Sequence, residues 1–197
     1  GVQTCALPIS GGANIRLAGK TVYPIDSVTI TGNVLSDTTT NVDIRHAHDV
    51  TIQANTCFAP KPNHLAVKDS QRVVVVGNTF NPRQFVRPGT IRFSNCSDCI
   101  LSSFTVHRFA TREGAIILDG CHGMVLTGLS LTDCGSGLVI RKSSDCSVIG
   151  CRVARTTEGA HDVFIDESSR NIQLLGNVFT GTHSIAPQAT TGLLKTD

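Results

Sequence analysis

The sequence has no tryptophan, one tyrosine and one methionine, and only 16% of its 197 residues are charged. The formal net charge of +2 gives no case for binding to nucleic acid or to an anionic membrane, and no basic stripe with interleaved aromatic residues is present. No apolar run approaches the roughly 18 residues that a membrane span needs. We therefore expect no nucleic-acid partner and no membrane span.

The first nine residues are set apart from the rest of the chain. Gly1–Ile9 resembles the translation of a common sequencing adapter, so we exclude it from the fold as an artefact. We expect the chain to be a fragment of a longer bacterial or environmental protein. The expected organisation is an artefact at 1–9, one repeat domain at 10–182 and a C-terminal tail or cap at 183–197.

What the sequence does contain is one short pattern repeated along its length. Val73–Phe80 reads Val-Val-Val-Val-Gly-Asn-Thr-Phe, an apolar strand that runs into a Gly-Asn corner and a second short strand. The pattern returns clearly at 28–35, 50–57 and 172–179, and more weakly at 99–106, 124–131 and 146–153. Successive copies lie 22 to 26 residues apart, and a near-constant period of this size indicates a solenoid.

Each copy follows another strand whose apolar residues alternate with a period of two, as a pleated strand requires. The predicted inward pairs of these strands are Val42/Ile44, Leu65/Val67, Ile91/Phe93, Ile116/Leu118, Leu138/Ile140 and Val163/Ile165. The sequence thus predicts about seven coils of three short strands, each strand paired in parallel with its counterpart one coil away.

The x-Val-x-Ile-x-Gly-Asn-x-Phe coil resembles the repeat of the pectate-lyase-like superfamily. The resemblance implies an all-β fold, a right-handed parallel β-helix with a period of 22–26 residues. It also implies a secreted or periplasmic location and a polysaccharide partner. In that superfamily the corner asparagines stack as a ladder, and the matching residues here are Asn33, Asn55, Asn78 and Asn177. The middle coils carry Phe104, Leu129 and Cys151 instead, so we expect an apolar stack there.

The eight cysteines follow the repeat rather than a metal-binding spacing. Cys96 and Cys121 share the position of the first turn that other coils fill with Ala47, Ser70, Ser143 and Ser168. Cys99 and Cys146 share a strand position with Val50, Val73, Met124 and Ile172. We interpret these cysteines as small interior residues and expect no metal. A disulfide between Cys96 and Cys121 is compatible with a strand spacing of ~4.8 Å.

Charged residues gather on the outward face of the strand that opens each coil. Two columns are expected there: Asp43, Ala66, Arg92, Ile117, Val139 and Phe164, and then Arg45, Lys68, Ser94, Asp119, Arg141 and Asp166. The longer loops, 81–90, 107–115 and 154–162, border the same face. The resemblance implies that this face and its loops form a groove for a polysaccharide, with Arg87, His107, Arg112, Glu113, Glu158 and His161 as candidate substrate-binding residues.

The first functional hypothesis is a lyase acting on an acidic polysaccharide. Elimination needs a cation that neutralises the uronate and a base that removes the neighbouring proton. The candidate catalytic residues are Lys68, Arg92, Arg141, Asp119 and Asp166. No tight cluster of three or four acids is visible, so we expect no cofactor, with calcium as the alternative.

Two alternatives remain open beside the lyase. A glycoside hydrolase would use Asp119 and Asp166, two coils or about 9.6 Å apart, although the motif series of the polygalacturonases is missing. A non-catalytic structural or adhesive β-helix would use the same residues as a ladder of charges with Arg141 between the two acids. Convergence of the candidate residues on one concavity would favour an enzyme, and dispersal would favour a binding or structural role.

A second face of the predicted solenoid is apolar where water is expected. Its outward residues are Val74, Val76, Ile100, Val125, Ile149 and Leu175. Apolar patches of this kind usually make contacts. We expect self-association or a missing segment of the chain to cover this stripe.

Overall fold

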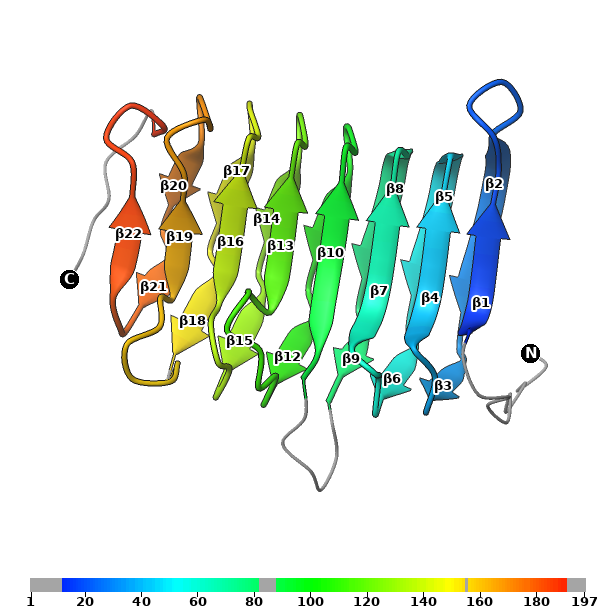
Figure 1. Cartoon of the computed structure of the whole chain (residues 1–197), viewed down its shortest axis with the longest axis horizontal. Coiled ribbons are helices and arrows are strands. Elements are labelled where there is room, and N and C mark those ends of the chain that lie inside the picture. The colour runs from blue at the N-terminus through cyan, green and yellow to red at the C-terminus, as the bar shows by residue number, and fades with distance from the viewer. Residues whose placement is uncertain (1–11, 82–87, 155, 191–197) are drawn as a thin grey trace.

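The computed structural model describes residues 12–81, 88–154 and 156–190, and the artefact predicted at 1–9 lies outside them. All the regular secondary structure in these three ranges is β-strand. The strands pair in parallel into three sheets that extend along the molecule (Figure 1). The predicted all-β parallel solenoid is therefore confirmed. The described residues contain no helix long and apolar enough to cross a membrane.

The three sheets are named here in the order in which each coil visits them. The first sheet contains β1 (Ala13–Ala18), β4 (Thr40–Arg45), β7 (Asn63–Lys68), β10 (Thr90–Ser94), β13 (Ile116–Asp119), β16 (Leu138–Arg141), β19 (Val163–Ile165) and β22 (His183–Ile185). The second sheet contains β2 (Ile25–Thr31), β5 (Ala47–Gln53), β8 (Gln71–Val76), β11 (Ile100–Ser102), β14 (Val125–Thr127), β17 (Ser147–Ile149) and β20 (Gln173–Leu175). The third sheet contains β3 (Val34–Ser36), β6 (Thr56–Phe58), β9 (Thr79–Phe80), β12 (Thr105–His107), β15 (Ser130–Thr132), β18 (Arg152–Ala154) and β21 (Val178–Phe179).

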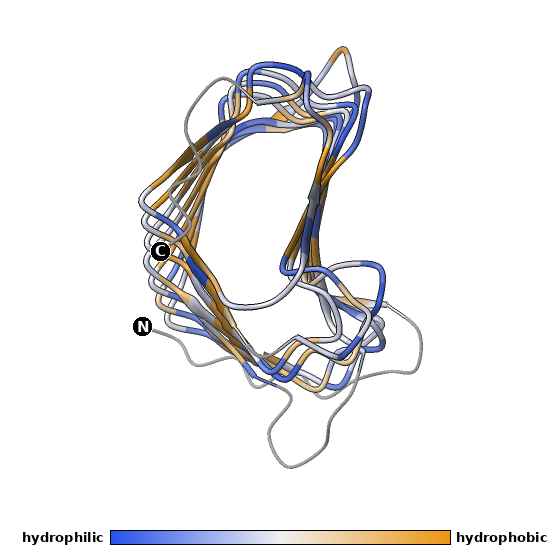
Figure 2. Ribbon diagram, turned by 90° about the vertical axis from the view of Figure 1, so that its left-hand side faces the viewer, coloured by the Kyte–Doolittle hydropathy of each residue, from blue (hydrophilic) through white to orange (hydrophobic). Residues whose placement is uncertain are grey.

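One strand from each sheet makes a coil, and the coils superimpose in the view along the axis (Figure 2). Seven coils run from β1–β3 to β19–β21, as the repeat predicts. The strand β22 pairs with β19 and adds an eighth strand to the first sheet. The segment predicted as a C-terminal tail or cap therefore continues the sheet over its first residues.

The interior is filled by the alternate residues that the period of two predicts. All six inward pairs of the first sheet, from Val42/Ile44 to Val163/Ile165, are at most 3% exposed. The second sheet contributes matching residues such as Val73 and Val75, which are fully buried. Burial of these side chains supplies the main driving force for stacking one coil on the next.

The corner between the second and third sheets turns at one left-handed residue in every coil. Its φ angle lies between 53° and 67° in Gly32, Ala54, Gly77, Ser103, Gly128, Gly150 and Gly176. Glycine adopts this conformation without a steric penalty, which explains why five of the seven coils use it. The glycine of the Gly-Asn corner thus reflects a left-handed backbone conformation that every coil adopts at this position.

The asparagine ladder is confirmed beside this corner. The side-chain amide of Asn33 donates to Asn55 Oδ1 at 3.0 Å, and that of Asn55 donates to Asn78 Oδ1 at 3.0 Å. Asn177 accepts from the backbone N–H of Cys151 at 2.8 Å at the other end of the solenoid. The middle coils hold the expected apolar stack, which consists of the buried residues Phe104, Leu129 and Cys151.

A second ladder lines the first turn, between the first and second sheets. Ala47, Ser70, Cys96, Cys121 and Ser143 occupy it as predicted and are buried. The last rung, however, is Ser169 and not Ser168: the Ser169 hydroxyl accepts the Ser143 N–H at 3.3 Å, whereas Ser168 is exposed. The residue inserted in that coil precedes the rung, so the pattern is displaced by one position.

The apolar stripe on the second sheet is also present. Ile100, Ile149 and Leu175 are 40%, 37% and 45% exposed. Val74, Val76 and Val125, which lie in the same face, are partly exposed. Its coverage by self-association or by a missing segment of the chain stays a prediction.

Candidate functional site

The five candidate catalytic residues lie along the outer face of the first sheet. Strand pairing places Lys68, Ser94, Asp119 and Arg141 in register on successive coils, as predicted. Asp166 follows the end of β19, the next strand of the sheet. The column therefore exists, but Lys68, Arg141 and Asp166 have separate partners and do not converge.

The lysine and arginine candidates of the two columns have local partners. Lys68 Nζ lies 3.8 Å from Asp69 Oδ2, and Arg92 Nη2 lies 2.8 Å from Glu113 Oε2. The Arg141 guanidinium lies 5.6 Å from the centre of the Phe164 ring, a cation–π contact within the sheet.

The carboxylate of Asp166 is held by the turn of the preceding coil and by its own turn. Its carboxylate accepts the Lys142 N–H at 3.1 Å and the Ser169 hydroxyl at 2.7 Å. Asp119 and Arg141 are in register on neighbouring strands, but within the described residues no ion pair joins Asp119, Arg141 and Asp166. Arg141 contacts the aromatic ring of Phe164, and Asp166 accepts a hydrogen bond from the backbone of the neighbouring coil.

The middle of this face is closed by a loop. Ile117 and Val139 point outward, yet they are 1% and 4% exposed. Gly114 lies against them, since a Cβ at Gly114 would be 2.7 Å from Val139 Cγ2 and 3.0 Å from Ile117 Cγ1. The loop at 107–115 therefore covers the central coils instead of bordering an open face, and the predicted groove is interrupted there.

The candidate substrate-binding residues are scattered. His107 lies on the third sheet, where its Nδ1 is 3.0 Å from Thr132 Oγ1 and 3.4 Å from Asp133 Oδ2. Arg112, Glu113 and Glu158 are exposed loop residues, and His161 lies 6.1 Å from Phe164, ring to ring. Arg87 lies outside the described residues. The structure does not bring this set together.

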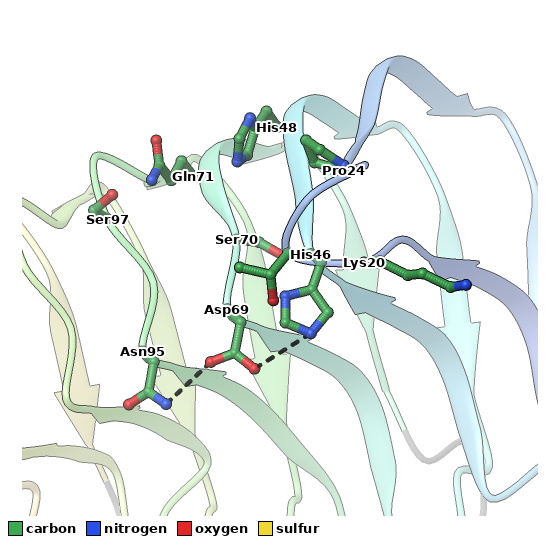
Figure 3. A pocket seen from close by; sticks show the side chains of 10 residues that line it. Lys20, Pro24, His46, His48, Asp69, Ser70, Gln71, Asn95 and Ser97 are labelled. Carbon is green, nitrogen blue, oxygen red and sulfur yellow. Dashed lines mark hydrogen bonds and ion pairs between the residues drawn. The ribbon is translucent and has the colours of Figure 1, made fainter.

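A pocket of about 570 Å³ lies elsewhere, over the first turn of the early coils (Figure 3). We call it the first-turn pocket. It is lined by Lys20, Thr21, Pro24, His46, His48, Asp69, Ser70, Gln71, Asn95 and Ser97. Four consecutive coils contribute, because the β1–β2 loop and the three turns that follow it stack side by side.

Asp69 is at the centre of the polar side chains in this pocket. Asn95 donates its amide to Asp69 Oδ1 at 3.1 Å, and His46 Nε2 lies 3.9 Å from Asp69 Oδ2 (Figure 3). His46, Asp69 and Asn95 occupy the same position of the turn in successive coils, with φ angles of 48°, 50° and 51°. This left-handed backbone, which Asn and Asp tolerate better than most residues, presents their side chains to solvent in a row.

The β1–β2 loop forms the wall of the pocket at the N-terminal side. Lys20 and Tyr23 exchange backbone hydrogen bonds at 3.0 Å in both directions, which closes a tight turn and leaves Tyr23 77% exposed. The loop is anchored to the next coil, since Gly19 N–H donates to Arg45 O at 2.9 Å and Ile25 N–H donates to His46 O at 3.0 Å. A Cβ at Gly19 would lie 2.2 Å from His46 O, so this close approach requires glycine.

The residues of the first-turn pocket were not identified from the sequence, because what they share is a position in a turn and not a face of a strand. His48 and His122 share one turn position, since bridges run from His48 through Gln71 and Ser97 to His122. The signal available was the polar residue that directly follows each of these opening strands: His46 after β4, Asp69 after β7 and Asn95 after β10. The β1–β2 loop, which makes the row into a pocket, has no counterpart in the repeat.

The stacked coils, the three parallel sheets and the corner ladder define a parallel β-helix protein. More specifically, the chain belongs to the family described as periplasmic copper-binding protein (NosD), whose sequence profile matches residues 7–194. No curated protein matches the sequence. The parallel β-helix read from the repeat is thus confirmed, while membership of the pectate-lyase-like superfamily stays a prediction.

One solved structure of similar architecture comes from a bacterial protein. A protein from Parabacteroides merdae, provisionally described as a glycosyl hydrolase, superposes with a TM-score of 0.59 at 11% identity, covering 81% of this chain and 84% of its own. The fluoroquinolone resistance protein QnrB1 matches over 92% of this chain and 78% of its own at 10% identity, but its TM-score of 0.28 is too low to indicate a shared fold. At such identities the likeness concerns the fold alone.

The residues described here do not fit a copper site. Copper prefers imidazole nitrogen and thiolate sulfur as ligands. In the three described ranges no group of three His, Cys, Asp or Glu side chains is placed to hold a metal, whether copper or calcium. The cysteines there are buried thiols, and burial raises the pKa of Cys57 and of Cys99 to about 12, which keeps both protonated at neutral pH.

Proposed function

We propose that this chain is a polysaccharide-binding β-helix module that holds sugar residues in the first-turn pocket, and that it works in the periplasm. The observation that carries the proposal is the row of His46, Asp69 and Asn95 inside a pocket of about 570 Å³. That volume is in the usual range for sites that bind small molecules or single sugar units. The periplasmic description of the family supports the location.

The chemistry of the row suits sugar hydroxyl groups. A carboxylate accepts hydrogen bonds at two oxygens, and an amide both donates and accepts, so Asp69 and Asn95 together match neighbouring hydroxyls on a pyranose ring. Because Asn95 and His46 already hold Asp69 in place, little side-chain entropy is lost when a ligand binds.

An exposed aromatic residue lies on the same loop as the pocket residues Lys20, Thr21 and Pro24. Tyr23 is the single tyrosine of the chain, and it is 77% exposed on the loop that walls the pocket. A flat aromatic ring offers a surface for the apolar face of a sugar. Tyr23 is therefore the expected stacking platform.

One cationic side chain of the pocket can meet an acidic sugar. Lys20, His46 and His48 line it with the single carboxylate of Asp69. An ammonium group recognises a carboxylate through a charge-assisted hydrogen bond. We therefore propose uronate-containing polymers as the ligands and Lys20 as the residue that meets the uronate.

Binding without cleavage is favoured over the lyase and the hydrolase hypotheses. A lyase needs its cation and its base at one reacting carbon, whereas Lys68, Arg92 and Arg141 have separate partners. A hydrolase needs two carboxyl groups free to act, whereas Asp166 is engaged by Lys142 N–H and Ser169.

The test is an affinity titration of the chain with a panel of acidic and neutral polysaccharides. The sharpest variant is Asn95→Gly, because Gly120 takes the same turn position one coil later and shows that glycine fits its left-handed backbone. Its matched control is Lys142→Gly, the same turn position outside the pocket. Loss of one or two hydrogen bonds should weaken binding about 3- to 10-fold in Asn95→Gly and leave it unchanged in Lys142→Gly.

Tyr23→Ala should weaken binding by a similar factor, since an aromatic contact contributes about 0.5–1.5 kcal/mol. Both variants should keep the melting temperature of the wild type, because the altered side chains are exposed. Equal affinity of the wild type and Asn95→Gly, or no binding by the wild type anywhere in the panel, would refute the proposal.

A further inference from the structure

Cys96 and Cys121 are consecutive rungs of the first-turn ladder. They stand between two pairs of residues in register on the same coils, Ser94 with Asp119 and Ser97 with His122. The backbone also joins them directly, since His122 N–H donates to Cys96 O at 2.9 Å. In-register residues on neighbouring strands are about 4.8 Å apart, which falls inside the range of Cα separations that a disulfide spans.

The two thiols are buried on adjacent rungs inside the solenoid, and each cysteine is 2% exposed. Their hydrogen bonds run to backbone carbonyls: Cys96 Sγ lies 3.3 Å from Ser94 O, and Cys121 Sγ lies 3.5 Å from Phe93 O. The interaction between the two thiols, together with burial, raises the pKa of Cys96, and the same interaction lowers the pKa of Cys121. The two sulfurs are therefore neighbours along the ladder.

We propose that Cys96 and Cys121 form a disulfide that links two adjacent coils in an oxidising compartment. A thiolate of the pair attacks the disulfide of an oxidant of the thiol–disulfide class, and one sulfur of the oxidant leaves as a thiolate. The second cysteine thiolate then attacks the mixed disulfide, so that the protein disulfide forms and the oxidant leaves fully reduced. Two electrons pass to the oxidant, and the two thiol protons are transferred to it or to solvent.

The disulfide would act on the proposed binding site without being part of it. Asn95 and Ser97, on either side of Cys96, line the first-turn pocket, while Cys96 itself points to the interior. Linking Cys96 to the next coil fixes the wall of the pocket that Asn95 and Ser97 form. The description of the family as periplasmic fits this chemistry, since disulfides form and persist in that compartment. The inference does not rest on polysaccharide binding.

The test compares protein refolded with oxidised and reduced glutathione with protein refolded in a reductant. Both samples are then denatured, alkylated and weighed, and the modified peptides are mapped. The oxidised wild type should carry two fewer alkyl groups than the reduced wild type, and both missing groups should map to Cys96 and Cys121. Equal alkylation of the two samples, or a lost pair that involves another cysteine, would overturn the proposal.

Two variants locate the bond. Cys96→Ser should abolish the difference, and it should fold because serine fills this rung at Ser70 and Ser143. Cys99→Val should keep the difference, because valine fills that strand position at Val73, and it removes a third buried thiol close to the pair. The oxidised wild type should also melt on the order of 5–10 °C above the reduced form, a shift that Cys96→Ser removes. Loss of the difference in Cys99→Val would contradict the assignment.

Discussion

The side-chain oxygen of Asn78 accepts two hydrogen bonds from Asn55, one from its backbone N–H at 3.0 Å and one from its side-chain amide at 3.0 Å. Asn78 in turn donates to Ile52 O at 2.9 Å and to Val76 O at 3.1 Å. A single buried amide thus satisfies polar groups on two coils and closes the corner between the second and third sheets.

Asn78→Ala should therefore destabilise the protein strongly. It leaves buried donors and acceptors without partners, and each such group costs roughly 1–3 kcal/mol. We expect the free energy of unfolding, measured by urea titration, to fall by about 2–4 kcal/mol. Asn33→Ala is the control at the less buried end of the ladder, with an expected loss of under about 1 kcal/mol. Equal losses in the two variants would show that the ladder does not act through its buried rungs.

Acid should destabilise the protein through His64. This residue is fully buried, it stacks on Phe109 with ring centres 4.5 Å apart, and its Nε2 lacks a hydrogen-bond partner. Burial lowers the pKa of His64 from 6.5 to about 3. The folded state therefore keeps the ring neutral while the unfolded chain takes up a proton, so stability falls as the pH drops from about 6.5 toward 3, by up to ~1.4 kcal/mol per pH unit.

The measurement is urea unfolding at pH 7 and pH 5 for the wild type and for His64→Gln. The variant removes the titrating group and keeps an amide that can meet Asn41, the partner of His64 Nδ1 at 3.3 Å. The wild type should lose about 2 kcal/mol more than the variant between the two pH values. Parallel losses would assign the acid sensitivity to other groups.

The two faces of β8 should respond differently to charge. Val73 is fully buried, whereas Val74 lies partly exposed in the apolar stripe. Val73→Asp buries an unpaired carboxylate and should prevent folding, as judged by circular dichroism. Val74→Asp should fold and should change self-association, as judged by sedimentation. Equal loss of the folded state in both variants would refute the register.

We expect Asp166 to stabilise the fold and not to take part in catalysis. Its carboxylate supports Lys142 N–H and the Ser169 hydroxyl, so Asp166→Ala should lower the free energy of unfolding by about 1–2 kcal/mol. Lys68→Ala removes an exposed side chain and should change that free energy by less than about 0.5 kcal/mol. The wild type should release no unsaturated products from uronate polymers. An absorbance rise from such products that Lys68→Ala abolishes would restore the lyase hypothesis.

The repeat in the sequence predicts the solenoid because strand alternation and the corner are both local. Val73 could be placed inside from its neighbours alone, and Asn78 from its corner. Ser168 was misplaced by one residue because an insertion can be accommodated on either side of a rung, and only packing decides which serine becomes buried. The fold was thus predictable from spacing wherever every coil obeys the same geometry.

The site was not predictable in the same way, because it depends on loops that the repeat does not constrain. The course of the loop that sets Gly114 against Val139 follows from contacts and not from periodicity. The first-turn pocket likewise arises where the β1–β2 loop, held at Gly19, folds beside the turns of later coils. His46, Asp69 and Asn95 are unremarkable in sequence, and they become a row only when their coils stack.

The central claim is that polysaccharide binds at the first turn and not along the outer face of the first sheet. Hydrogen exchange of the backbone amides, followed by mass spectrometry with and without a bound uronate polymer, tests it most directly. We predict added protection in the peptides that contain Lys20–Pro24, His46–His48, Asp69–Gln71 and Asn95–Ser97, with β13 and β16 unchanged. Protection along β10, β13 and β16 with an unchanged first turn would contradict the account.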